Sequence, residues 1–154
     1  MNPLFLSLLV IPLTVVAANP QQLPNPNLTP GKADPTLTKE IICSSDFRTG
    51  TIRNVTQKIR NQVYKNYNVE NYKGYCSGTE GCEVDHLISL ELGGSNDIQN
   101  LWPQSYVNNP NTAHDKDKLE NKLHKLVCSN KISLLDAQTQ ISKNWISAYT
   151  KYIK

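Results

Sequence analysis

The sequence contains no hydrophobic run long enough to cross a membrane. Its longest apolar segment, Leu4 to Ala18, falls short of the roughly 20 residues that a spanning helix needs. Charged residues make up 19% of the 154 residues and hydrophobic residues 38%, a balance that excludes both a membrane bundle and a disordered polyelectrolyte. The length excludes two large domains and leaves room for one. The net charge of +3 is mild, so it permits a polyanionic partner without requiring one.

Charge is missing from the first part of the chain, where no charged residue precedes Lys32. The apolar segment therefore cannot be an amphipathic helix of the mature fold, and residues 1–18 are predicted to be a signal peptide. Small and β-branched residues at Val16–Ala18 favour cleavage before Asn19, and no cysteine lies nearby to carry a lipid. We expect a secreted or periplasmic protein with no stable membrane association after cleavage. An uncleaved anchor at the membrane interface is the alternative.

The Cys-x-x-Cys spacing is also absent, which argues against a zinc ribbon. The chain has an even number of cysteines, as exported disulfide proteins do: Cys43, Cys76, Cys82 and Cys128. Four cysteines permit three pairings. Cys76 and Cys82 flank two glycines and could close a small loop, which would leave Cys43 to pair with Cys128.

Prolines are concentrated after the predicted cleavage point, at positions 20, 24, 26, 30 and 35. This composition favours extended or polyproline conformations. Residues 19–37 are therefore predicted to form an extended arm that buries little, and residues 38–154 to form a single domain.

Acidic residues are absent between Asp46 and Glu70. Apolar residues in this region recur at intervals of three and four and predict one amphipathic helix: Ile52, Val55, Ile59, Val63 and Tyr67. The same region carries five positive charges: Arg48, Arg53, Lys58, Arg60 and Lys65. They form either a solvated helix face or a surface for a polyanion.

The second half of the chain predicts two short strands followed by two helices. The first strand begins at Glu83 and ends near His86, and the second covers residues 98–103, where Pro103 stops it. A helix is predicted over residues 112–128, and a last helix opens at Ser133 with Asp136 completing a capping box. The predicted fold class is α+β and mostly helical.

One segment has a specific order of polar residues. Glu83-Val84-Asp85-His86 is followed by a turn at Gly93-Gly94 and then by Asn100-Leu101-Trp102-Pro103. This order resembles the HNH endonucleases, whose ββα-metal hairpin has an acid and a histidine at a strand end. His86 and Asn100 lie 14 positions apart, the usual separation in that family. Further segments look like small exported bacterial HNH-endonuclease-like proteins: Leu28 to Gly31, Lys116-Asp117, Leu119-Glu120, Ala137-Gln138 and Trp145.

The resemblance implies a role for each motif residue. His86 would be the general base, because an imidazole titrates near neutral pH. Asp85 would bind a divalent cation, and Asn100 would hydrogen-bond across the hairpin and hold the loop that bears His86. A helix residue would complete the metal site, either His114 at the start of the predicted helix or Asn109 in the loop before it. A site with only two protein ligands favours Mg²⁺, with Mn²⁺ or Zn²⁺ as substitutes.

The function implied is that of an exported, metal-dependent HNH endonuclease that hydrolyses phosphodiester bonds of DNA, or also of RNA. Its five basic side chains would then contact nucleic-acid phosphates, and the absence of any base-reading motif predicts little sequence specificity. We expect a monomer. The alternative is a noncatalytic exported binding module that keeps the HNH hairpin as a scaffold.

Overall fold

A computed structural model describes residues 23–69, 71–72, 75–76, 81–106 and 111–154, with 71–72 and 75–76 described by their backbone alone. The predicted signal peptide and Asn109 lie outside these residues. The described part is α+β, with five α-helices and two antiparallel two-stranded sheets. This confirms the predicted fold class in its general form.

The central element is a hairpin of β3 (Cys82–His86) and β4 (Leu101–Ser105), in which Val84 lies opposite Pro103. Two short 3-10 helices, Leu90–Leu92 and Ile98–Asn100, lie in the connection between these strands. A second small sheet pairs β1 (Asn71–Tyr72) with β2 (Tyr75–Cys76). The hairpin thus joins strands predicted from the sequence, but its second strand begins and ends later than expected.

Pro103 does not stop the second strand, contrary to the prediction. The hydrogen bonds from Leu87 N to Asn100 O and from Tyr106 N to Gly81 O fix the alternation of bonded pairs along the hairpin. Counted from either bond, Pro103 and Val84 form a pair without hydrogen bonds. The nitrogen of Pro103 therefore faces away from β3, and its lack of an N–H costs the ladder nothing.

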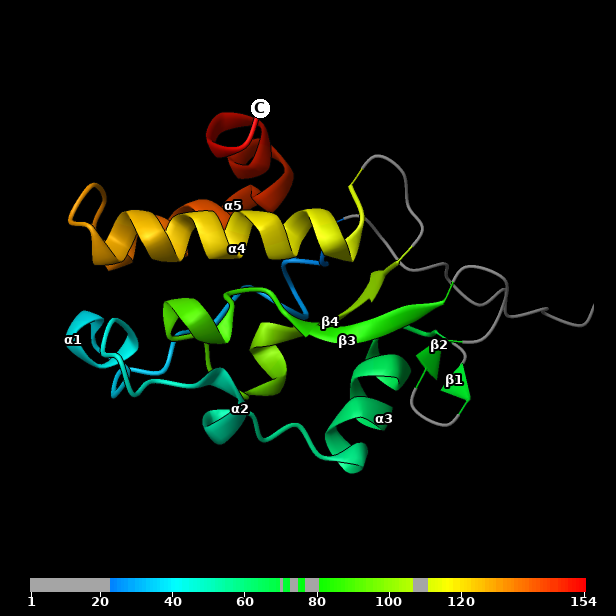
Figure 1. Ribbon diagram of the computed structural model, residues 1–154. Coiled ribbons are helices and arrows are strands. Elements are labelled where there is room, and N and C mark those ends of the chain that lie inside the picture. The colour runs from blue at the N-terminus through cyan, green and yellow to red at the C-terminus, as the bar shows by residue number, and fades with distance from the viewer. Residues whose placement is uncertain (1–22, 70, 73–74, 77–80, 107–110) are drawn as a thin grey trace, which may run out of the picture.

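Helices lie on both sides of the hairpin (Figure 1). On one side are α1 (Lys39–Ile42), α2 (Thr49–Ile52) and α3 (Gln57–Asn66). On the other, α4 (Ala113–Cys128) lies along the hairpin and packs against α5 (Leu134–Tyr152). The core between these layers contains the largest buried apolar side chains of the two long helices and the hairpin: Trp102, Leu119, Leu123, Ile141 and Trp145.

The single helix predicted across Ile52 to Tyr67 is wrong in its first part. The backbone leaves the helical conformation after α2, at Arg53, and α3 begins only after Thr56, whose side chain accepts a bond from Ile59 N. Between them, Asn54 N donates to the Asn96 side chain, 3.0 Å away. This tertiary contact and the Thr56 cap divide a pattern that looks continuous in the sequence.

The two long helices begin where the sequence predicts. Thr112 and Asp115 form a capping box at the start of α4, and the Ser133 hydroxyl accepts a bond from Asp136 N at the start of α5. The proline-rich arm, in contrast, buries more than predicted. Thr29 is 1% exposed, and its hydroxyl donates to the carbonyl of Leu101 and bonds to the phenol of Tyr67.

Candidate functional site

His86 lies at the end of β3 and is 1% exposed. Asn96 Nδ2 donates to the carbonyl of Ile52, so the Asn96 amide oxygen faces His86 Nε2, 3.1 Å away. Because that oxygen can only accept, Nε2 carries the proton and the lone pair lies on Nδ1. Among the described residues, Nδ1 has no hydrogen-bond partner. The ring is therefore held in one orientation, and its basic nitrogen is buried and has no hydrogen-bond partner among the described residues.

His86 is neutral at pH 7. Its pKa is lowered to about 4: burial is the largest cause, Arg53 and Lys116 act in the same direction, and Asp85 and the bond to Asn96 oppose the shift. Arg53 directly follows α2 and is exposed, so it places a cation near this imidazole. In such an arrangement the cation can bind an anion while the neutral imidazole accepts a proton next to it.

Asn100 is fully buried and bonds to both sides of the hairpin connection. Its Oδ1 accepts from Ile88 N and Lys32 N, at 2.9 and 3.2 Å, and its Nδ2 donates to the carbonyls of Ile88 and Ser95, both at 2.9 Å. A Cβ on Gly94 would lie 1.7 Å from the Ile88 carbonyl oxygen, so the turn needs glycine there. One side chain therefore fixes the loop between His86 and β4 and joins the arm to it.

We expect Asn100→Ala to lower the free energy of unfolding by about 2 to 4 kcal/mol, because it leaves buried backbone groups without partners. Urea unfolding followed by circular dichroism measures this loss. The matched control is Asn121→Ala on α4, which removes one exposed bond to Asp117 O and should cost less than about 0.5 kcal/mol. Equal stabilities of the two variants would contradict this role for Asn100.

Asp85 pairs with a buried lysine from α4. Lys116 is fully buried, and its Nζ donates to Asp85 Oδ2 at 2.7 Å, to the carbonyl of His86 at 2.6 Å and to Glu120 Oε1. Burial opposes the charge on Lys116, but Asp85 and Glu120 outweigh it and raise the pKa of the ammonium. Burial would likewise raise the pKa of Asp85, but Lys116 overrides it and lowers that pKa. We call these three side chains the Lys116 cluster.

The predicted metal ligands do not fit a metal in this arrangement. Three oxygen atoms surround a cation next to His86, but that cation is the Lys116 ammonium, and Asp85 already neutralises it. The imidazole of His114 is 74% exposed and lies 3.7 Å from Asp117, and its ring centroid lies 6.0 Å from that of Tyr106, which follows β4. In the part of the chain that is described, no group of three possible metal ligands includes Asp85 or His114.

Sequence reasoning did not identify the Lys116 cluster. The available signal was helical spacing, because Lys116 lies three positions from Ala113 and from Leu119, which are both buried. A lysine in the apolar stripe of a helix needs a carboxylate partner. Glu120, one turn later, supplies one of them, and Asp85 supplies the other from β3.

Two of the predicted phosphate contacts, Arg48 and Arg53, flank α2, and the other three lie on α3. Arg48, Arg53, Lys58 and Lys65 are exposed, and Arg60 is half-buried. Arg48 donates to the carbonyls of Ser45 and Phe47, so this side chain also holds its own loop. Because the predicted single helix is divided, only Lys58, Arg60 and Lys65 share a helix.

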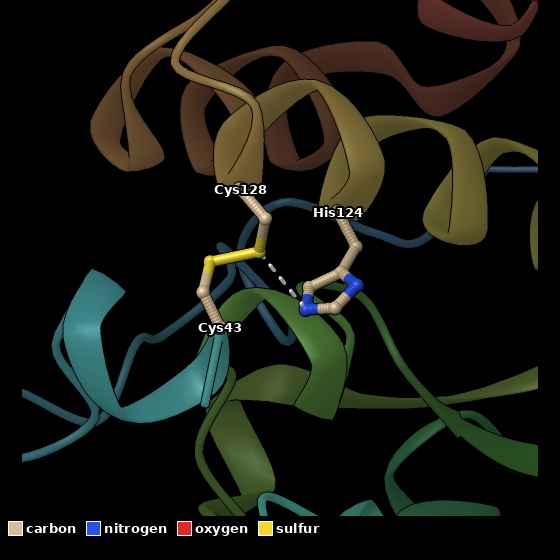
Figure 2. Close-up of side chains that lie close together, drawn as sticks. All are labelled: Cys43, His124 and Cys128. Carbon is tan, nitrogen blue, oxygen red and sulfur yellow. Dashed lines mark hydrogen bonds between the residues drawn. A yellow bond between two sulfur atoms is a disulfide. The ribbon is translucent and has the colours of Figure 1, made fainter. Parts of the chain in front are cut away.

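A second cluster lies where the C-terminal end of α4 meets the end of α1. Cys43 and Cys128 form a disulfide, which confirms that predicted pair (Figure 2). His124 Nε2 lies 3.4 Å from Cys128 Sγ and 3.0 Å from the carbonyl of Ile42. The ligand atoms of the two cysteines and His124 lie within 4.8 Å of one another, so this group could hold a metal ion. Cys82 is also disulfide-bonded, while the side chain of Cys76 lies outside the described part.

The disulfide fits the oxidising environment outside the cytoplasm. None of the described helices is long and apolar enough to span a membrane. Comparison with protein-family models, with curated proteins and with solved structures finds no match to the chain. The resemblance to HNH endonucleases therefore rests on the motif residues of this sequence.

Proposed function

We propose that the chain is an exported HNH-type endonuclease that cleaves phosphodiester bonds with His86 as its general base. One observation carries the proposal: His86 is neutral, is held by Asn96 and has an unpartnered Nδ1 among the described residues. Most buried polar atoms in proteins have a hydrogen-bond partner, so the unpartnered ring nitrogen needs an explanation, and a role as proton acceptor supplies one. A base needs one nitrogen to be fixed and the other left for a proton.

The surrounding residues support a phosphate substrate. His86 Nδ1 would accept the proton of the attacking nucleophile, while Arg53 would attract the phosphate whose ester bond breaks. The other exposed cations, Arg48 beside α2 and Lys58 and Lys65 on α3, would bind neighbouring phosphates without reading bases, so DNA, and also RNA, would be cut with little sequence specificity. Activity should therefore fall steeply as salt is added.

The family resemblance predicts Mg²⁺ as cofactor, with Mn²⁺ or Zn²⁺ as substitutes. The role of Asp85 here is different, because this carboxylate orders Lys116 and, through it, the carbonyl of His86. Asn100 positions the loop, and neither residue needs a metal for this.

The Lys116 cluster favours a second candidate, a noncatalytic exported binding module. Lys116 uses the carboxylate that the family motif assigns to metal, and His86 is only 1% exposed. Both features suit a hairpin kept for its shape. In that case the exposed cations beside α2 and on α3 would bind a polyanion, and no bond would break.

The test is to incubate the oxidised protein with plasmid DNA or a structured RNA in Mg²⁺, Mn²⁺, Zn²⁺ or EDTA, and to measure binding in parallel. The proposal expects cleavage by the wild type and a loss of at least about a hundredfold in His86→Gln, with binding unchanged. The EDTA arm decides whether a divalent cation is needed. Binding without cleavage in every arm would support the binding module instead.

A further inference from the structure

We propose that Cys43, His124 and Cys128 form a redox-controlled site for a thiophilic metal ion such as Zn²⁺. In the oxidised protein the two sulfurs are joined as a disulfide, and they cannot act as thiolate ligands (Figure 2). In the reduced protein the same atoms become two thiolates beside an imidazole. This site is separate from His86 and does not depend on the proposed nuclease function.

The helix geometry preorganises two of the three ligands. His124 and Cys128 lie four positions apart on α4, so their side chains project from the same face on successive turns. His124 Nε2 already lies 3.4 Å from Cys128 Sγ. The two potential ligand atoms therefore already lie close together at the end of α4.

The third ligand comes from the residue that follows α1. Cys43 and Cys128 have their Cα atoms 5.4 Å apart. Two thiolates bound to Zn²⁺ at about 2.3 Å in tetrahedral geometry lie about 3.8 Å from each other. Rotation of the two cysteine side chains can separate the sulfurs to this distance while the helices stay in place. Both cysteines and His124 are only partly buried, so solvent can supply a fourth ligand.

The chemistry balances if a dithiol is the reductant. Two electrons break the Sγ–Sγ bond, the dithiol is oxidised to its own disulfide, and its two protons pass to Cys43 and Cys128. Binding of Zn²⁺ then displaces both thiol protons. His124 exchanges its bond to the Ile42 carbonyl for the metal, with its proton on Nδ1. Two thiolates and one imidazole are a donor set that suits Zn²⁺ and not Mg²⁺.

The site would hold the end of α1 against the end of α4 in both the oxidised and the reduced protein. The disulfide connects the end of α1 to the end of α4, and a metal bound by the same residues would make the same connection. Because Zn²⁺ binds only the reduced state, it should also make the disulfide easier to reduce. A reducing, zinc-containing compartment would then contain the metal form, and an oxidising one the disulfide form.

The experiment uses Co²⁺ as a spectroscopic probe of the reduced protein, in a Cys76→Ser/Cys82→Ser background that removes the other thiols. Under anaerobic conditions, a phosphine-reduced sample should bind one Co²⁺ per chain. It should show a thiolate-to-cobalt charge-transfer band and the visible bands of a tetrahedral ion. Zn²⁺ should then displace Co²⁺. The oxidised sample should show none of these signals.

Three further substitutions identify the ligands. Cys43→Ser removes one thiolate, so its reduced form should not show the thiolate-to-cobalt band of the reduced parent. His124→Ala should weaken Zn²⁺ binding at least about tenfold. His114→Ala removes an exposed imidazole elsewhere on α4 and is the matched control, which should bind as tightly as the parent. Absence of a tetrahedral Co²⁺ spectrum in the reduced protein, or equal Zn²⁺ affinity with and without His124, would overturn the proposal.

A second measurement does not depend on the variants. At a fixed ratio of reduced to oxidised dithiol, added Zn²⁺ should lower the fraction of protein in the Cys43–Cys128 disulfide form. The ratio of reduced to oxidised protein should grow in proportion to one plus the ratio of free Zn²⁺ to its dissociation constant. A disulfide fraction that is independent of Zn²⁺ would contradict the site.

Discussion

Removal of the Cys43–Cys128 disulfide, as Cys43→Ser/Cys128→Ser, should lower the free energy of unfolding by about 4 to 5 kcal/mol. The bond closes a loop between residues 85 positions apart, and the entropy that such a closure takes from the unfolded chain corresponds to about 4.6 kcal/mol at 25 °C. This is a large part of the stability of a small domain. Urea unfolding of the oxidised wild type and of the double variant measures the difference.

The matched control is Ser44→Ala/Ser129→Ala, which changes the exposed neighbours of both cysteines and leaves the bond in place. This variant should keep its stability to within about 1 kcal/mol. A loss below about 1 kcal/mol in the cysteine double variant would show that the ends of α1 and α4 are held by other contacts.

Replacement of Lys116 by methionine should destabilise the protein by about 3 to 5 kcal/mol at neutral pH. Methionine fills a similar volume, so the loss reports mainly on the missing charge. Without the ammonium, the Asp85 carboxylate has no compensating cation, and Glu120, whose pKa burial already raises to about 8, stays close to it. Removal of one partner from a buried ion pair is costly because the other charge stays desolvated.

The pH dependence separates this electrostatic cost from a packing defect. Without Lys116, the buried carboxyls have pKa values above those in the unfolded chain. The free energy of unfolding of the variant is therefore lowered at pH values where the carboxyls of the unfolded chain are ionised. The stability difference from the wild type should be full at neutral pH and shrink as pH falls towards about 4. A packing defect would give the same difference at every pH.

Lys118→Met is the matched control for this substitution. Lys118 makes a comparable contact, with Asp115 at 3.0 Å, but its side chain is 61% exposed. An exposed ion pair contributes little to stability, because solvent and salt screen it. Similar losses for Lys116→Met and Lys118→Met would contradict the view that burial makes the Lys116 cluster important.

The parts of the fold that the sequence predicts best are those set by local signals. Thr112 and Ser133 each have an acidic residue three positions later, and both begin helices as a capping motif predicts. The strand pair around Val84 follows from β-branched residues and the glycine turn. The end of the second strand was wrong because the effect of Pro103 depends on which way its nitrogen faces the partner strand.

The parts that the sequence could not predict depend on contacts between distant residues. The helix expected across Ile52 to Tyr67 is divided where Asn54 bonds to Asn96, 42 positions away. Lys116 reaches Asp85, 31 positions away, and so takes a carboxylate that the motif alone assigns to metal. Local spacing identifies which residues are polar in a motif, but not which of them become partners.

The central claim is that His86 acts as a neutral general base, and cleavage rates of the wild type and His86→Gln across about pH 5 to 8 test it most directly. Because the pKa of His86 is lowered to about 4, the wild-type rate should change little over this range. His86→Gln should be at least about a hundredfold slower throughout, with an unchanged circular dichroism spectrum. Equal rates for the two proteins, or no cleavage by the folded wild type, would contradict the account.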